Sequence, residues 1–278
     1  MTELLNPVFI FGPGFTGHAF AQIWAGPVFG SLRNPAKTAE LAAKNILPVP
    51  LNDAEQVVER LRGAHLIVAA PPTDQGCPGL AHLADMTPSA KSVTYLSTTG
   101  VYGDLSGGWA FEWSPVNPAS VRGRRRVSAE NAWRAVRPDL KIARLPGIYG
   151  AGRSVLDRLR AGRASRIVKP GHVFSRIHVD DLAAGLAALV QSEASGVFHF
   201  CDEEAAPPQD VTAFGADLLG VPVPDAIDYA QADLSEMARS FYSECKRVSN
   251  ARAKAALGWR PRFRTYREGL TSIRDAGG

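Results

Sequence analysis

The stretch VFIFGPGFTG, at residues 8–17, constrains the fold of this chain more than any other. An apolar run is followed by Gly12, Gly14 and Gly17, which have the GxGxxG spacing of a tight turn from a strand into a helix. In such a turn the first glycine bends the backbone, the second lets it approach a pyrophosphate, and the third lets helix and strand pack closely. Free N–H groups at the helix start hold the phosphates. The stretch therefore predicts a dinucleotide site, although an ordinary glycine-rich loop is the alternative.

Beyond this stretch, short apolar runs alternate with segments of helical periodicity, which is typical of a parallel sheet whose strands are joined by helices. Strands are expected at residues 7–11, 27–32, 46–50, 65–70, 92–97, 141–144 and 197–200. Helices are expected at residues 16–25, 35–44, 54–62, 80–85, 120–136, 155–160 and 180–191. The pattern predicts an α/β fold, a doubly wound parallel sheet of the Rossmann type with helices on both faces.

The sequence pattern changes after Cys201, where proline-rich segments separate short helical patterns. This change predicts a smaller C-terminal α/β lobe. We expect a nucleotide-binding domain at residues 1–145, rejoined by a segment at about 176–200. Residues 146–175 and 201–278 would then form the smaller, substrate-binding lobe.

Composition narrows the class of partner. Lysine and arginine exceed aspartate and glutamate by 31 to 27, a net charge of +4 that is too small to indicate nucleic acid. The three cysteines form no CxxC pair, so we expect neither a disulfide framework nor a metal site. No leader pattern and no apolar run of membrane-spanning length is present, so a cytoplasmic protein without membrane contact is expected. A small, anionic molecule is the expected partner.

The choice of dinucleotide should depend on the end of the second strand. An acid about twenty residues after the glycine motif would bind the ribose of NAD. This chain instead has Ser31, Arg33 and Asn34 there, which can donate hydrogen bonds to a 2′-phosphate. NADP(H) is therefore favoured over NAD(H), unless Arg33 is simply a solvated turn residue. Four further residues are expected to line the cofactor site: Phe15, Thr16, Ala70 and Pro71.

Hydroxyl side chains follow the fifth expected strand in LSTTGVYGD, at residues 96–104, and the carboxyl edge of such a sheet is where ligands bind. With this motif the chain resembles the extended short-chain dehydrogenase/reductase family, in its NAD-dependent epimerase/dehydratase group, which acts largely on nucleotide sugars. The resemblance covers most of the chain. The further motifs that carry it are GPGFTG near the start, ARLPGIYGAGRS at 143–154, SRIHVDDLA at 175–183 and KRVSNARAKAALGW at 246–259.

The resemblance places Thr98 on the catalytic Ser/Thr of the family. The family's proton-transfer pair YxxxK, usually followed by a glutamate, aligns with RGRRRVSAE at residues 122–130, so Arg122 stands at the tyrosine position and Arg126 at the lysine position. A guanidinium stays protonated and cannot shuttle a proton, but it can stabilise a carboxylate, a phosphate or an oxyanion. Helical spacing puts both arginines on the apolar side of their helix, facing the cofactor cleft. A solvated basic face is the alternative, and the expected one for Arg124.

Other members of the predicted site follow from the same motifs. Thr99, Tyr102, Tyr149 and Arg176 are expected at the substrate, while Arg176 could instead form a salt bridge between the lobes. His178 is expected to be structural. Asp180 and Asp181 are expected to cap the following helix. The polar outer face of the helix at 120–136 makes a monomer as plausible as the homodimer common in the family.

Two functions are compatible with this sequence. The first is an atypical NAD(P)-dependent oxidoreductase or epimerase that acts on a small anionic or nucleotide-sugar-like substrate. The dehydratase branch is disfavoured, because Thr99 and Gly100 replace its Asp-Glu pair. The second is a non-catalytic NAD(P)H-binding redox sensor or partner-binding module, in which the altered YxxxK positions reflect lost catalysis.

Overall fold

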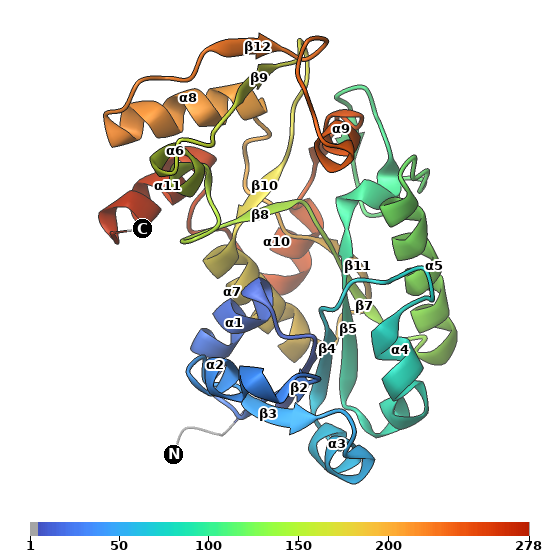
Figure 1. Ribbon diagram of the computed structural model, residues 1–278. Coiled ribbons are helices and arrows are strands. Elements are labelled where there is room, and N and C mark those ends of the chain that lie inside the picture. Colours follow the sequence, from blue (N-terminus) through green and yellow to red (C-terminus); the bar gives the residue numbers. More distant parts are fainter. Residues whose placement is uncertain (1–4, 278) are drawn as a thin grey trace.

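The computed structural model describes residues 5–277, so the outermost residues of the two predicted domains, 1–4 and 278, lie outside it. Within this range a parallel sheet of seven strands has the order β11-β7-β5-β4-β1-β2-β3 (Figure 1). Its strands are β1 (Val8–Phe11), β2 (Val28–Leu32), β3 (Leu47–Pro50), β4 (His65–Val68), β5 (Ser92–Thr98), β7 (Lys141–Leu145) and β11 (Gly196–His199). This order reverses between β1 and β4, the point at which such sheets bind dinucleotides. The predicted fold class is confirmed.

Helices cover both faces of the sheet, because its central strands are buried on both sides. On one face lie α1 (Phe15–Ile23), α2 (Thr38–Ala42), α7 (Val179–Gln191) and α10 (Ala251–Leu257). On the other lie α3 (Ala54–Leu61), α4 (Pro78–Leu83) and α5 (Val121–Val136). Figure 1 shows α1 and α7 to the left of the sheet and α4 and α5 to the right. The helix expected at 35–44 begins as a short 3-10 turn, η1 (Pro35–Lys37), and the one at 80–85 ends in η2 (Ala84–Ser89).

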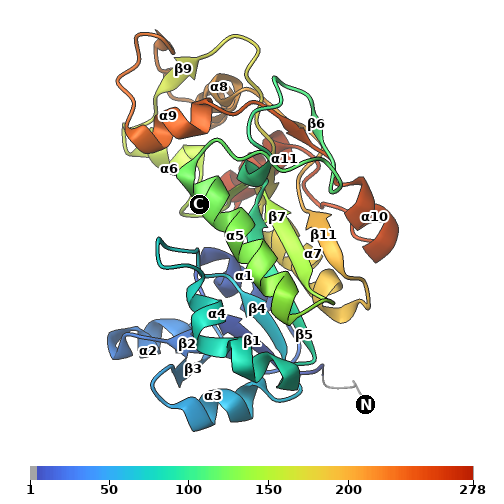
Figure 2. The same ribbon diagram turned by 90° about the vertical axis from the view of Figure 1, so that its right-hand side faces the viewer.

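A smaller lobe stands beyond the carboxyl edge of the sheet (Figure 2). It contains three two-stranded parallel pairs: β8 (Gly147–Tyr149) with β10 (Arg176–His178), β9 (Arg166–Val168) with β12 (Ala226–Asp228), and β6 (Trp109–Ala110) with β13 (Arg247–Val248). Its helices are α6 (Val155–Arg160), α8 (Pro208–Leu219), α9 (Glu236–Tyr242) and α11 (Tyr266–Asp275). The sequence predicted short helices here but none of these strands, which are only two or three residues long.

The start of α7 differs from the expectation. His178, not an aspartate, is its N-cap, and its Nδ1 accepts a hydrogen bond from the Asp180 N–H at 3.2 Å. Asp181 instead accepts bonds from the N–H groups of Arg262 and Phe263, at 2.7 and 3.0 Å. His178 is thus structural, as expected, while Asp181 fastens the C-terminal segment to α7.

Neither a membrane-spanning helix nor a cluster of metal ligands is found within residues 5–277. No helix there has the length and apolar character needed to cross a bilayer. In the same range, no three His, Cys, Asp or Glu side chains gather as a metal site would require.

Candidate active site at the junction of sheet and lobe

Each of the three glycines in the glycine-rich loop has a different structural role. Gly12 has φ +76°, and a Cβ there would lie 2.7 Å from the Cβ of Ala70, so the position needs glycine for its conformation and for its contact with the end of β4. A Cβ on Gly14 would meet nothing within 4 Å, so its surface is open to a ligand. Gly17 is buried, and a Cβ there would touch Ile10 at 3.4 Å. The loop therefore has the geometry of a pyrophosphate cradle.

The start of α1 is also suited to an anion. Gly14 is its N-cap, so no side chain occupies the first N–H groups of this helix of nine residues. Those groups and the helix dipole attract negative charge. Phe15 and Thr16 form the first turn beside Gly14. A dinucleotide pyrophosphate fits this chain on the strength of an open glycine and an uncapped helix start.

The residues expected to select the cofactor differ in whether their side chains are already held by hydrogen bonds. Ser31 supports the loop, because its Oγ accepts a hydrogen bond from the Gly12 N–H at 2.8 Å. The Asn34 side chain caps η1 by accepting from the Ala36 N–H at 3.1 Å. Arg33 is exposed between them, and Pro71 is exposed at the end of β4. Of Ser31, Arg33 and Asn34, Arg33 is therefore the residue most available to a ligand.

A cleft of about 970 Å³ separates the carboxyl edge of the sheet from the smaller lobe. Thr98, Thr99 and Gly100 line it where β5 ends, and Arg122 lines it at the start of α5. The opposite wall comes from β8, α6, β10 and α9. Aromatic side chains contribute to that wall: Tyr149, Phe174, Phe241, Tyr242 and Tyr266.

The lining of the cleft is strongly cationic. Within the described part of the chain it contains six basic residues and two acidic ones. The basic residues are Arg122, Arg153, Arg158, Arg163, Arg176 and Lys246, and the acidic ones are Asp157 and Glu244. Among residues 5–277, none of the ion pairs involves Arg122, Arg158 or Arg163. Three unneutralised guanidinium groups favour an anionic ligand.

Thr98 stands where the sheet, the cleft and the next turn meet. It is the N-cap of η3 (Thr99–Tyr102), and its Oγ1 accepts from the Gly100 N–H at 3.2 Å. The hydroxyl proton remains free to donate toward the cleft. Thr99 is buried, and its hydroxyl donates to the Leu145 carbonyl at 3.5 Å. Thr98 is thus better placed than Thr99 to meet a substrate.

The two arginines of α5 have different positions. Arg122 is exposed and lines the cleft. Arg126, one turn further, is half-buried and absent from the cleft lining. Its guanidinium bonds to the Leu96 carbonyl, with the Tyr95 hydroxyl at 3.3 Å and the Tyr95 ring beneath it. Arg126 therefore fastens α5 to β5, whereas Arg122 can reach a substrate.

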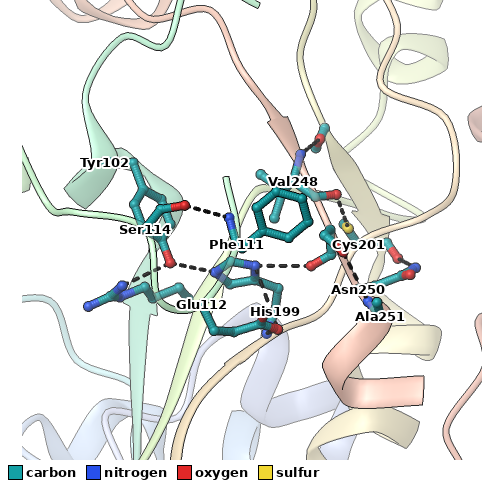
Figure 3. A network of polar contacts seen from close by, with 12 residues as sticks. Tyr102, Phe111, Glu112, Ser114, His199, Cys201, Val248, Asn250 and Ala251 are labelled. Atoms are coloured by element: carbon teal, nitrogen blue, oxygen red, sulfur yellow. Dashed lines mark hydrogen bonds and ion pairs between the residues drawn. The ribbon is translucent and has the colours of Figure 1, made fainter. Parts of the chain in front are cut away.

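Tyr102 is not at the substrate, contrary to the expectation. It is 1% exposed, and its hydroxyl lies 2.7 Å from Nε2 of His199 and 2.8 Å from Nη1 of Arg144. Figure 3 shows the Tyr102 hydroxyl directed toward the His199 ring. Burial raises the pKa of Tyr102 to about 12 and lowers that of His199 to about 3. Both groups are neutral at ordinary pH and hold the structure together.

This buried network continues into α5. Arg144 makes two bonds to Glu130, of 3.0 and 2.7 Å, and the Ser97 hydroxyl donates to Glu130 at 2.6 Å. Glu130 is the glutamate of the RGRRRVSAE segment. The network thus joins α5, β7 and the residue immediately before Thr98, which fixes the position of the cleft's floor.

Tyr149 and Arg176 both line the cleft, but they do so differently. The Tyr149 hydroxyl is buried where a Cβ on Gly269 would lie, within 2.0 Å, and burial raises its pKa. Only the ring of Tyr149 can therefore meet a substrate. Arg176 donates to the carbonyls of Phe174 and Ala206 at 2.7 and 2.9 Å. It makes no salt bridge between the lobes within residues 5–277.

Sequence reasoning did not identify six charged residues of the cleft: Arg153, Asp157, Arg158, Arg163, Glu244 and Lys246. Arg153 lies over the ring of Phe15 at 5.3 Å, between the glycine-rich loop and the cleft. Arg158 in α6 and Arg163, three residues after the end of that helix, add positive charge to the cleft wall. Glu244 and Lys246, 2.6 Å apart, approach from the C-terminal segment. The motif ARLPGIYGAGRS contains Arg153 and the motif KRVSNARAKAALGW begins at Lys246, so the sequence could have indicated both; the remaining charged residues lie in no such motif.

Comparisons with known proteins agree with this architecture. No family model matches the chain. A 3-diazoavenalumate denitrifying reductase from Streptomyces is 34% identical over 137 residues, which span 46% of this chain and 45% of the reductase. The match thus covers less than half of that relative. A solved structure of a functionally unknown conserved protein from Silicibacter pomeroyi is 40% identical, with 98% of this chain and 99% of that one aligned and a TM-score of 0.90.

A more distant solved structure shares the fold and was determined with NAD bound. The dTDP-glucose 4,6-dehydratase DesIV from Streptomyces venezuelae is 19% identical over 96% of this chain and 95% of its own, with a TM-score of 0.73. We conclude that the chain belongs to one family with the Silicibacter pomeroyi protein and has the fold of the NAD-dependent epimerases and dehydratases of the extended short-chain dehydrogenase/reductase type.

Proposed function

We propose that this protein is a nicotinamide-dinucleotide-dependent reductase of a small anionic substrate. One observation carries the proposal: a cationic cleft opens beside Thr98, on the same sheet edge as an uncapped glycine-rich helix start. A reduced nicotinamide bound there would supply hydride. The relative named as a reductase supports this class of chemistry over epimerisation.

The residues of the chain have distinct roles in this proposal. Thr98 donates a hydrogen bond that orients the substrate oxygen. Arg122, which cannot exchange a proton at physiological pH, holds a carboxylate or phosphate of the substrate by charge and paired hydrogen bonds. Arg126 and the Glu130 network hold α5 so that Arg122 faces the cleft.

The proposal includes a preference for NADP(H). Arg33 is exposed beyond β2, and no acid follows that strand to bind a ribose hydroxyl. Calorimetric titration with NADPH, NADP+, NADH and NAD+ tests this directly. We expect Arg33→Ala to weaken NADPH at least tenfold, about 1.4 kcal/mol, and NADH little. Equal weakening of both would show that Arg33 does not read the 2′-phosphate, and no binding of any of the four would overturn the proposed function.

The role of Thr98 is tested separately. We expect Thr98→Ala to lower turnover of an accepted anionic carbonyl compound by about a hundredfold, which is typical of losing one donor to a developing oxyanion. Thr98→Ser should restore most of the turnover, because it keeps the hydroxyl. NADPH affinity should stay within about twofold of the unsubstituted protein in both variants. Full turnover by Thr98→Ala would remove Thr98 from the active site.

A further inference from the structure

The smaller lobe brings a side chain that can donate a proton close to Thr98. We propose that Lys246, held by Glu244, is the general acid of this site and delivers a proton to the carbonyl oxygen of a 2-oxo acid group as that carbonyl is reduced. This inference rests on the proposed function. It is needed because Arg122, which lines the cleft, carries a guanidinium that does not release its proton.

The position of the pair is defined by Gly100. A Cβ built on Gly100 would lie 3.5 Å from Thr98 Oγ1 and 3.8 Å from Glu244 Oε2. The same Glu244 oxygen bonds Lys246 Nζ at 2.6 Å. The carboxylate and the threonine hydroxyl thus face each other across one glycine without a side chain. A substrate oxygen placed at Thr98 lies beside the ion pair.

Burial and a backbone bridge fix the position of the Glu244–Lys246 pair. The side chains of Glu244 and Lys246 are 12% and 8% exposed, and both line the cleft. Residue 246 forms a parallel bridge with Phe174, which fixes its backbone against the loop before β10. An ammonium has three donors and Glu244 uses one, so two remain for other acceptors.

The surroundings indicate the kind of substrate. Arg122, Thr98 and Lys246 line the same cleft, so Arg122 can hold a carboxylate while the Lys246 ammonium meets the adjacent carbonyl oxygen. Phe174 and Phe241, with ring centroids 4.1 Å apart, supply an apolar wall above them. A 2-oxo carboxylate with an aromatic or apolar tail matches this arrangement.

The proton balance of the step is simple. A reduced dinucleotide, when bound, would supply hydride to the carbonyl carbon; the π electrons would move to the oxygen, and Lys246 Nζ would give that oxygen its proton. The product is a 2-hydroxy acid together with the oxidised dinucleotide. Lys246, left as a neutral amine beside Glu244, regains a proton from water before the next turnover.

Two probes test the inference on NADPH-loaded protein. N-Phenyloxamate, an amide that is not reduced, measures binding by calorimetry, and phenylglyoxylate measures reduction by the loss of NADPH absorbance. We expect Lys246→Arg to bind N-phenyloxamate within threefold of the unsubstituted protein yet to reduce phenylglyoxylate about a hundredfold more slowly, the usual effect of losing a general acid. Lys246→Met should also bind N-phenyloxamate at least tenfold more weakly.

Controls separate this role from a structural one. Lys254 forms a similar ion pair with Glu203, at 2.7 Å, outside the cleft, so Lys254→Met should leave both readouts unchanged. If Lys246→Arg reduces phenylglyoxylate at the unsubstituted rate, the proton comes from elsewhere and the inference is overturned while the proposed function stands. If the unsubstituted protein binds NADPH but neither probe, the 2-oxo acid assignment is overturned alone. If it binds no dinucleotide, the proposed function fails and the inference with it.

Discussion

At the scale of single residues, the glycine-rich loop contains one glycine that the fold requires and one that ligand binding requires. Gly12 and Gly14 are two positions apart, but a Cβ on Gly12 would lie 2.7 Å from Ala70 Cβ, whereas one on Gly14 would meet nothing within 4 Å. We expect Gly14→Ala to leave the free energy of unfolding within about 0.5 kcal/mol of its original value, as at other positions without contacts. The same substitution should lower NADPH affinity at least tenfold, because its methyl group occupies the approach of the pyrophosphate.

Gly12→Ala is the matched comparison for that prediction. It forces an alanine to φ +76° against the end of β4 and should lower the melting temperature measurably. Thermal unfolding by circular dichroism and calorimetric titration distinguish the two variants. Unchanged NADPH affinity in a folded Gly14→Ala protein would mean that a dinucleotide does not lie over this loop.

Single residues also show where sequence reasoning reaches its limit. The loop glycines could be predicted because their spacing alone sets the geometry, and Thr98 because the resemblance places it on the catalytic Ser/Thr of the family. Tyr102 was placed wrongly because its partner, His199, is 97 residues away and gives no local signal. Glu244 was missed for the same reason: only the folded chain brings it to Gly100.

At the scale of elements, α5 depends on a buried ion pair for its place. Glu130 and Arg144 are almost fully buried, and their charges neutralise each other between α5 and β7. Arg144→Met would leave the buried Glu130 carboxylate with only Arg134, which is 41% exposed and 3.4 Å away, so we expect the free energy of unfolding to fall by about 3 kcal/mol. The double variant Glu130→Met/Arg144→Met should lose less than the two single variants together, because no lone charge remains.

Urea denaturation of the four proteins in this cycle measures the coupling. Arg274→Met is a suitable control, since Arg274 pairs with Asp275 on the surface and should matter by less than about 1 kcal/mol. Additive losses in the Glu130/Arg144 cycle would show that the two side chains stabilise the protein independently.

The elements of the smaller lobe show why its structure was harder to predict than that of the sheet. The central strands β1 and β4 are buried along their whole length and are almost entirely apolar, so the local sequence indicates them. The strands β9 and β12 have three residues each and alternate little, and β12 is exposed along its length. They form because each pairs with a segment that is distant in the sequence, so the local sequence does not predict them.

At the scale of the whole molecule, four buried histidines make stability depend on pH, because burial lowers the pKa of His65, His172, His178 and His199. Burial lowers the pKa of His65 and His172 to about 4 and that of His199 to about 3, whereas an unfolded chain has histidines near 6.5. Between about pH 6.5 and 4 the unfolded chain therefore binds protons that the folded chain does not. The histidine contribution to stability is complete above that window and is lost as the pH falls through it.

His172 offers the clearest test of this linkage. Its ring packs against Phe241 and Tyr242, and within the described residues neither ring nitrogen has a hydrogen-bond partner. His172→Phe should therefore keep the packing while removing one proton from the linkage. Urea midpoints measured from pH 7.5 to 4.5 should fall less steeply in this variant than in the unsubstituted protein. His82→Gln, at an exposed histidine, should leave the slope unchanged, and an equal slope in His172→Phe would show that His172 does not contribute to the acid sensitivity.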